Sequence, residues 1–144
     1  FHDPYVRDDL MDYGVLTDTL ETSTSWSNLP RLWQEGRAVV KARPNTVCMT
    51  HISHAYDNGA NLYFIVLTPM DLEQPLEDYR AYHRGIIDAV VSNGGSLSHH
   101  HGVGRLFAPW YSEQVGEVAH GAFRALKAGL DPNGIMNPGA YGLG

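Results

Sequence analysis

The sequence predicts an α+β domain in which helices cover one face of a mainly antiparallel sheet. Two β-type runs joined by a turn indicate a hairpin, and an amphipathic helix with clear ends follows them. The elements come in the order strand, helix, hairpin, helix, histidine-containing segment, helix.

The first third of the chain predicts one strand and one helix. Residues 14–22 are rich in Thr and alternate loosely between apolar and polar side chains, which favours a strand. Ser25 or Ser27 can then cap a helix whose first turn holds Pro30. Apolar residues recur at helical spacing until Arg-Pro at 43–44, so we expect one helix here, with a glycine at position 36 as its weak point.

The middle of the chain predicts a hairpin followed by a second helix. Residues 46–54 and 60–68 are both β-type, and the Tyr-Asp-Asn-Gly segment at 56–59 between them is rich in turn formers. A helix is expected to start at Pro75, with its apolar residues on one face, and to end at Asn-Gly-Gly, residues 93–95.

The last part of the chain predicts one more helix, from Trp110 to Gly129. The Asp-Pro-Asn-Gly segment at 131–134 ends it, because proline and glycine cannot continue the helical pattern. We therefore expect three helices in total, all packed on the same sheet.

Composition excludes several classes of function. The chain has 144 residues, enough for one domain with a core, and a net charge of -6 without a basic cluster, which argues against nucleic-acid binding. The longest apolar stretch, around 62–67, is far too short for a membrane span. Cys48 is the one cysteine, so no internal disulfide can form, and we expect a cytoplasmic protein.

The chain begins with Phe1 rather than Met, and its motifs lie in the C-terminal half with no recognisable cofactor fingerprint before them. We therefore expect that it is part of a larger protein.

The most informative motif is the run His99-His100-His101, which glycines flank on both sides. Imidazoles can hold or release a proton near neutral pH, and glycines let a bulky or flat group approach the backbone closely. If the run were a strand, His99 and His101 would share a face and His100 would oppose them. Gly102-Val103-Gly104 is too short a match to indicate a dinucleotide fingerprint.

Other interpretations of the histidines stay open. One or two of them can be buried and structural while another is solvated. A metal site is the second alternative, because imidazole binds Zn, Cu, Fe and Ni, and His51 and His54 could join such a site. However, the sequence has no helical His pair and no Cys cluster of the usual ligand spacing.

Two further residues are candidates for chemistry. Tyr63 lies near the start of a strand that looks buried, and a phenol beside a histidine can act as an acid or base. Core packing is the common alternative for a tyrosine. Arg7 can bind a carboxylate or phosphate through two nitrogens, or it can pair with a neighbouring aspartate at the surface.

Residues 93–104 (Asn-Gly-Gly-Ser-Leu-Ser-His-His-His-Gly-Val-Gly) resemble the histidine motif of the alkyldihydroxyacetonephosphate synthases and their bacterial FAD-linked oxidase relatives. The resemblance extends over nearly the whole chain, through Tyr5-Val6-Arg7-Asp8, Leu20-Glu21-Thr22-Ser23 with Trp26, residues 56–64 and residues 130–139. It implies that residues 1–144 form the C-terminal substrate-binding region, a ferredoxin-like cap domain, of a flavoprotein in the vanillyl-alcohol-oxidase superfamily. A separate N-terminal domain would hold most of the FAD.

The resemblance also implies roles for individual residues. Arg7 would bind the substrate headgroup, and Tyr63 would be catalytic together with His99, His100 and His101. The cofactor FAD would contact His100 and three further residues in the histidine loop and the tail: Gly102, Gly104 and Asn137. The implied reaction exchanges the acyl chain of an acyl-dihydroxyacetone phosphate for a long-chain alcohol, through a flavin adduct and without net oxidation. The implied partners are a small or lipid-like substrate and the FAD-binding domain of the same protein. The resemblance is also compatible with a homodimer.

One departure keeps alternatives open. The tail Asn-Pro-Gly at 137–139 is more similar to the wider group of bacterial FAD-linked oxidases and hydroxy-acid dehydrogenases. Those hydroxy-acid enzymes tend to carry Gly-Glu-His-Gly where this chain has His-His-His-Gly, which favours the synthase-like branch. The alternatives are FAD-dependent oxidation of a 2-hydroxy acid or alcohol, and a metal-binding or structural module without catalysis.

Overall fold

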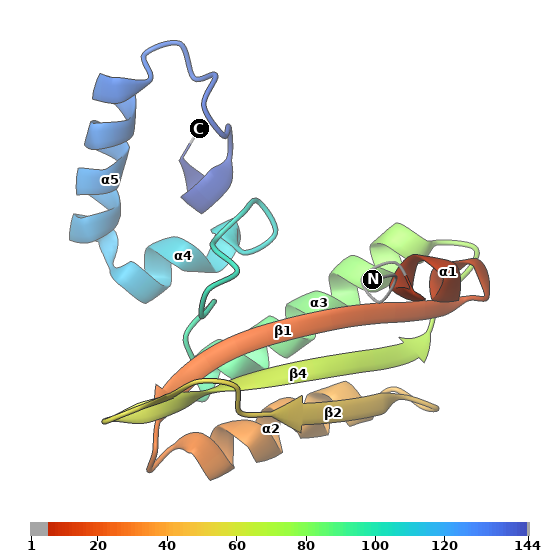
Figure 1. Ribbon diagram of the computed structural model, residues 1–144. Coiled ribbons are helices and arrows are strands. Elements are labelled where there is room, and N and C mark those ends of the chain that lie inside the picture. The colour runs from red at the N-terminus through yellow and green to blue at the C-terminus, as the bar shows by residue number, and fades with distance from the viewer. Residues whose placement is uncertain (1–5, 144) are drawn as a thin grey trace. The chain divides into compact units, whose positions relative to one another are not determined.

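The computed structural model describes residues 6–143, which form two compact units. Unit 1 extends to Ser96, and unit 2 begins at Leu97 (Figure 1). Phe1 and Tyr5, which entered the sequence arguments above, lie outside the described residues. The division falls two residues before the histidine run, so the run belongs to unit 2 and Tyr63 to unit 1.

Unit 1 contains an antiparallel sheet, as the sequence predicts. Its strands are β1 (Val15–Ser25), β2 (Val47–His51), β3 (Ala55–Tyr56) and β4 (Gly59–Pro69). The order is β1-β4-β2, and β3 also pairs with β4. β4 is therefore the central strand, paired with β1 along its whole length and with β2 over five residue pairs. The expected hairpin is confirmed, with a short break between β2 and β3.

Helices α2 (Leu29–Lys41) and α3 (Pro75–Ser92) pack against each other and cover one face of the sheet (Figure 1). The core lies between them and the strands, and period-two alternation selects the strand residues that enter it. Its largest members are Phe64 from β4 with Leu32 and Val40 from α2 and Ile87 and Val90 from α3. The α+β fold with helices on one face is therefore confirmed for unit 1.

The suspected weak point in α2, Gly36, has a packing reason. A Cβ atom there would lie 3.1 Å from the Phe64 ring, so the glycine lets the ring of the central strand approach the helix closely. The loss of helix propensity at this position is offset by that contact.

The opposite face of the sheet, turned away from α2 and α3, is called the open face here. It carries the odd-numbered residues of the three long strands, which pair in rows across the sheet. The row formed by Glu21, Tyr63 and His51 is the Tyr63 row. The next row holds Thr19, Ile65 and Met49, and the one after it holds Thr17, Leu67 and Val47.

Two helix details of unit 1 differ from the sequence-based expectation. A seven-residue helix, α1 (Val6–Asp12), precedes β1 and was not expected. Neither Ser25 nor Ser27 caps α2; Asn28 precedes that helix without a side-chain cap bond. The Asn28 amide instead donates to the Asn93 carbonyl oxygen at 2.7 Å, which ties the start of α2 to the end of α3.

Unit 2 consists of α4 (Ala108–Val115), α5 (Glu117–Leu130) and a short 3₁₀ helix, η2 (Ala140–Gly142). The single helix expected from Trp110 to Gly129 is wrong, because Gly116 has φ 81° and breaks it in two. The turn after α5 is confirmed: Asp131 pairs with Lys127 and accepts the N–H groups of Ile135 and Met136. No helix among residues 6–143 is long and apolar enough to cross a membrane.

Gly59 provides a test of the strand arrangement. A Cβ atom there would collide with the main-chain carbonyl oxygen of Thr24 on β1, which cannot move without separating β1 from β4. We expect Gly59→Ala to lower the free energy of unfolding by about 3 kcal/mol. Urea unfolding of the full-length protein measures it. The matched control is Gly121→Ala in α5, where the new methyl group meets nothing within 4 Å; equal losses for both variants would contradict the strand pairing.

Candidate functional site

Tyr63 lies on the open face of β4, where it is half-buried. The expectation that its strand is buried is therefore correct for one face only: Leu62 and Phe64 enter the core, and Tyr63 faces the other way. The His51 ring stacks on the Tyr63 ring with centroids 4.9 Å apart and an angle of 17° between the planes. Glu21 is the cross-strand neighbour on β1. Tyr63 thus lies in the sheet between a strand that carries an imidazole and a strand that carries a carboxylate.

Glu21 is buried together with Asn61, although both belong to the open face. The exposed fractions of these residues are 2% and 0%. The Asn61 amide nitrogen donates to Glu21 Oε1, and it also donates to Ser53 Oγ at 2.7 Å. The Asn61 amide oxygen accepts the backbone N–H groups of Ser53 at 2.9 Å and His54 at 2.7 Å. One amide therefore fixes the corner between β2 and β3 and holds the carboxylate beside it.

His54 completes this network. Its Nδ1 lies 3.0 Å from Ser53 Oγ and 3.7 Å from Glu21 Oε1, so an imidazolium at this position would partly compensate the buried carboxylate. His51 and His54 take different partners in unit 1, the first on Tyr63 and the second beside Glu21.

Sequence reasoning missed Glu21 and Asn61 as site residues. Glu21 stood within the quoted Leu-Glu-Thr-Ser segment, and Asn61 within the segment that contains Tyr63. The available signal was that Glu21, Asn61 and Tyr63 are all odd-numbered residues of paired strands and so lie on the same face of the sheet. That signal can be used only when the β1–β4 register is known.

The histidine run lies in a loop of unit 2 that consists of bends and not of a strand. The strand alternation that would separate His100 from the other two therefore does not apply to this loop. His99 Nδ1 and His100 Nδ1 are 3.1 Å apart, and the rings of His100 and His101 meet edge to face with centroids 4.6 Å apart. The two Nδ1 atoms of His99 and His100 lie within hydrogen-bond distance, which allows a proton held by one of these rings to pass to the other. The Gln114 side chain of α4 accepts the Leu97 N–H and holds the start of the loop.

Gly102 and Gly104 follow the histidines and leave their surroundings open. No atom lies within 4 Å of a Cβ built at either position, and Gly102 has φ 77°, a conformation that favours glycine. The backbone of this loop can therefore approach a flat ring closely. These residues fit the face of a flavin, whereas the sequence shows no phosphate-binding fingerprint for the nucleotide end of FAD.

The two remaining expected residues lie in other segments. Arg7 is exposed in α1, which packs beside the start of β1, while Glu21 and Tyr63 pair six residues further along that strand (Figure 1). Asn137 lies in the loop after α5 with φ 46°. The structure thus brings Tyr63 together with His51 and groups the three histidines, while Arg7 belongs to the other end of unit 1.

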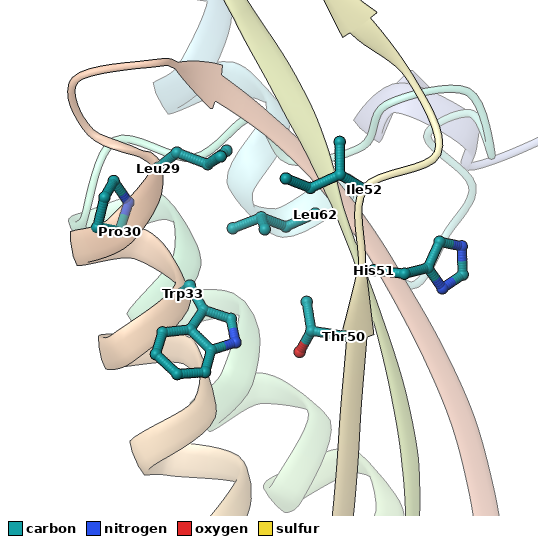
Figure 2. A pocket seen from close by; sticks show the side chains of 7 residues that line it. All are labelled: Leu29, Pro30, Trp33, Thr50, His51, Ile52 and Leu62. Atoms are coloured by element: carbon teal, nitrogen blue, oxygen red, sulfur yellow. The ribbon is translucent and has the colours of Figure 1, made fainter.

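A pocket of about 370 Å³ lies between α2 and β2 (Figure 2). Trp33 and Thr50 face each other across it, and Ile52 closes one end. Figure 2 shows the His51 ring turned away from these side chains. The pocket therefore lies on the helix side of the sheet, and His51 is the member of the Tyr63 row that lines it.

A second polar cluster lies on the helix side of β1. Asp18 Oδ2 accepts from His83 Nδ1 at 2.9 Å, and the Tyr79 hydroxyl lies 3.4 Å from the same nitrogen. Burial raises the pKa of Tyr79 to about 12, and the negative charge of Asp18 contributes to the increase. The cluster joins α3 to β1, and within it the Tyr79 hydroxyl group stays protonated at any physiological pH.

The alkaline titration of Tyr79 tests this cluster. Because its folded-state pKa of about 12 exceeds the ordinary value of 10.0, the folded protein retains a proton that the unfolded chain loses. The stability contributed by Tyr79 is therefore present below pH ~10 and falls as the pH rises toward ~12. We expect Tyr79→Phe to remove the phenol that ionises latest in an absorbance titration. Tyr13→Phe, at an exposed position, should leave that late phase intact; an unchanged late phase in Tyr79→Phe would contradict the assignment.

Together these features define an α+β domain that presents titratable side chains on an open sheet face and, in a second unit, in a glycine-flanked loop. The chain belongs to the family of FAD linked oxidases, C-terminal domain, whose model matches residues 2–141.

Known proteins resemble the chain over nearly its full length. An alkyldihydroxyacetonephosphate synthase from Dictyostelium discoideum is 36% identical over 141 residues, which are 94% of this chain and 23% of the relative. The uncharacterized FAD-linked oxidoreductase YgcU of Escherichia coli K12 is 32% identical over 146 residues, 92% of this chain and 29% of that protein. A solved alkyldihydroxyacetonephosphate synthase superposes with a TM-score of 0.65 and 31% identity, over 95% of this chain and 22% of that one. The chain thus spans about a quarter of these proteins.

Asn61 offers a test of the network around Tyr63. Replacing it with alanine removes the donor to Glu21 and both acceptor bonds to the corner at Ser53 and His54. We expect Asn61→Ala to lower the free energy of unfolding by about 3 kcal/mol, because a buried carboxylate loses its amide partner. Denaturant unfolding of the full-length protein measures the change. The control, Gln34→Ala, removes an exposed amide from α2 and should cost less than about 0.5 kcal/mol; an equally small loss for Asn61→Ala would refute the network.

Proposed function

We propose that this chain is the substrate-facing C-terminal domain of an alkyldihydroxyacetonephosphate synthase-like flavoenzyme. The observation that carries the proposal is the Tyr63 row, a phenol held on an open sheet face between a stacked imidazole and a buried carboxylate. The likeness to synthases over more than nine-tenths of the chain supports it. The proposed reaction exchanges the acyl chain of an acyl-dihydroxyacetone phosphate for a long-chain alcohol.

The exchange is redox-neutral overall. The bond from the substrate carbon to the carboxylate oxygen breaks, and the alcohol oxygen forms the new ether bond to that carbon while the alcohol loses its proton. Bound FAD supplies a ring system that can stabilise charge at the substrate carbon. The protein must therefore hold a phosphate, move a proton at that carbon and receive the proton of the alcohol.

The residues of this chain suit those tasks. Tyr63 is the proposed acid–base group at the substrate carbon, and the stacked His51 holds its ring in place. Arg7, exposed at the start of α1, is the proposed ligand of the substrate phosphate. The contacting imidazoles of His99, His100 and His101 are proposed to carry the alcohol proton away. His100, with Gly102, Gly104 and Asn137, is the proposed contact for FAD.

A second candidate function is FAD-dependent oxidation of a 2-hydroxy acid or alcohol, in which hydride passes from the substrate to the flavin. Membership in a family of FAD linked oxidases favours it. The two reactions differ in one measurable property. Oxidation bleaches the flavin when the hydroxy acid is added alone, whereas exchange requires the alcohol co-substrate and leaves the flavin oxidised after turnover. We further propose a cytoplasmic location and an FAD-binding domain in the remainder of the same polypeptide.

Replacement of the proposed proton-carrying groups tests the assignment. We expect Tyr63→Phe and His100→Ala to reduce kcat for acyl-to-alkyl exchange by roughly a hundredfold or more in the full-length flavoenzyme, because each removes a proton-transfer group. Product formation from acyl-dihydroxyacetone phosphate and hexadecanol measures kcat. Tyr13→Phe is the matched control, since Tyr13 is exposed at 84% and lies between α1 and β1. Wild-type rates in both site variants would refute the proposed roles.

A further inference from the structure

A further cavity of unit 1, of about 350 Å³, lies where α1, the start of β1 and the start of α3 meet (Figure 1). This volume falls within the range of roughly 300–1,000 Å³ that is usual for small-molecule sites. Most of its wall is apolar and comes from four segments of the chain: Met11, Leu16, Met70, Pro75 and Leu76. Leu16 and Asp18 belong to the helix side of β1, so this cavity is separate from the open face.

Asp18 and Tyr79 supply polar side chains to the wall of the cavity. Of the described residues that line it, Asp18 alone carries a charge at neutral pH, because the raised pKa of Tyr79 keeps that hydroxyl protonated. The cavity is therefore an apolar space with a single anionic group in its wall.

The Asp18 carboxylate has room for another hydrogen-bond donor. Its Oδ1 accepts the Thr19 N–H at 2.8 Å, its Oδ2 accepts from His83 Nδ1 at 2.9 Å, and the Tyr79 hydroxyl is a further partner. A carboxylate accepts about four hydrogen bonds, which leaves one position for a ligand. The Asp18 side chain is 22% exposed and the His83 side chain 3%, so the carboxylate is the member of this pair that reaches the cavity.

The surface around the cavity carries more acidic than basic side chains. The direct chain neighbours of the wall residues include four acids and one base: Asp12, Asp71, Glu77 and Asp78 against Arg80. Asp78 is paired with Arg43, whereas Asp12, Asp71 and Glu77 are exposed. Solvent screens such charges, but their sign favours the approach of a cation over that of an anion.

We propose that this cavity binds a small organic cation, in which a primary ammonium group donates to Asp18 and an apolar or aromatic body fills the space beside Met11, Leu16 and Leu76. A neutral apolar molecule would leave the partly desolvated carboxylate without a counter-charge, and an inorganic cation would leave the apolar wall unfilled. The aromatic ring of Tyr79 suits the same ligand, because aromatic faces attract ammonium groups. The inference does not depend on the proposed function, since neither Tyr63 nor the histidine run belongs to this site.

Isothermal titration calorimetry of the full-length flavoenzyme tests the inference with two probes of nearly equal shape, 2-phenylethylammonium and the neutral 2-phenylethanol. We expect saturable binding of the ammonium probe, with a Kd roughly tenfold or more below that of the alcohol, because its hydrogen bond to Asp18 joins two charged groups. Asp18→Asn keeps the shape of the side chain and removes its charge. It should weaken binding of the ammonium probe by roughly tenfold or more and leave binding of the alcohol unchanged.

Asp12→Asn is the matched control, because it removes an exposed acid of α1 that does not line the cavity. It should change the Kd of the ammonium probe by less than about twofold.

A second variant decides the matter if Asp18→Asn does not fold, which its melting temperature and flavin content reveal. Met11 is 43% exposed in α1, so Met11→Arg places a positive charge at the cavity without disturbing the core. We expect it to weaken binding of the ammonium probe by roughly fivefold or more. Its control is Val118→Arg, which adds the same charge at a position that is 91% exposed in α5 and should leave the Kd unchanged.

Three results would overturn the inference: no saturable binding of 2-phenylethylammonium to the wild-type enzyme, equal affinity for the ammonium probe and the alcohol, or unchanged affinity in a folded Asp18→Asn variant. The inference also fails if the control variants weaken binding as much as the cavity variants do, since the effect would then come from net charge alone. Calorimetry measures binding without turnover, so none of these results bears on the proposed exchange reaction.

Discussion

The alternation of side chains along β4 is the constraint on which the rest of unit 1 depends. Leu62, Phe64 and Val66 are buried against the helices, so Tyr63 and Ile65 must lie on the other face. A shift of one residue in the pairing would expose the Phe64 ring and bury the phenol, and each large apolar side chain withdrawn from the core costs about 1.5–3 kcal/mol. Because β4 is paired on both sides, such a shift would break both ladders. The position of Tyr63 is thus enforced by the packing of its neighbours.

Asn61 connects that constraint to the site. It has the same parity as Tyr63, so its side chain lies on the open face, yet it is fully buried because the chain between β2 and β3 folds over it. Its amide satisfies two backbone N–H groups of that corner and the Glu21 carboxylate at once. Since a buried carboxylate without partners is strongly unfavourable, the corner, the amide and Glu21 are stable only together. The network that folds the corner therefore also fixes the negative group beside Tyr63.

Sequence patterns predicted the parts of this fold that depend on local signals. The turn formers at 56–59 and the apolar face after Pro75 gave the hairpin and α3 correctly. The break at Gly116 was missed because the helical spacing of apolar residues continues across it. Helix α1 was missed because a segment of seven residues is too short to show a clear helical period. The sequence did not reveal whether the histidine run is a strand or a loop, and in the loop that forms, neighbouring rings touch. Glu21 and Asn61 are 40 positions apart, and only strand register brings them together.

The open face holds features that do not stabilise unit 1 by themselves. Met49 and Val47 remain about half exposed, so they bury little apolar area, and Glu21 occupies a desolvated position where an uncharged side chain of similar size would fold at lower cost. The open face thus leaves large apolar side chains partly exposed and buries a carboxylate, whereas on the helix side Leu62, Phe64 and Val66 are buried in the core. Departures of this kind from the rules of stable folding are typical of functional sites in general. Because the core of α2, α3 and β4 supplies the stability of unit 1, the opposite face is free to carry a titratable row and an apolar one side by side.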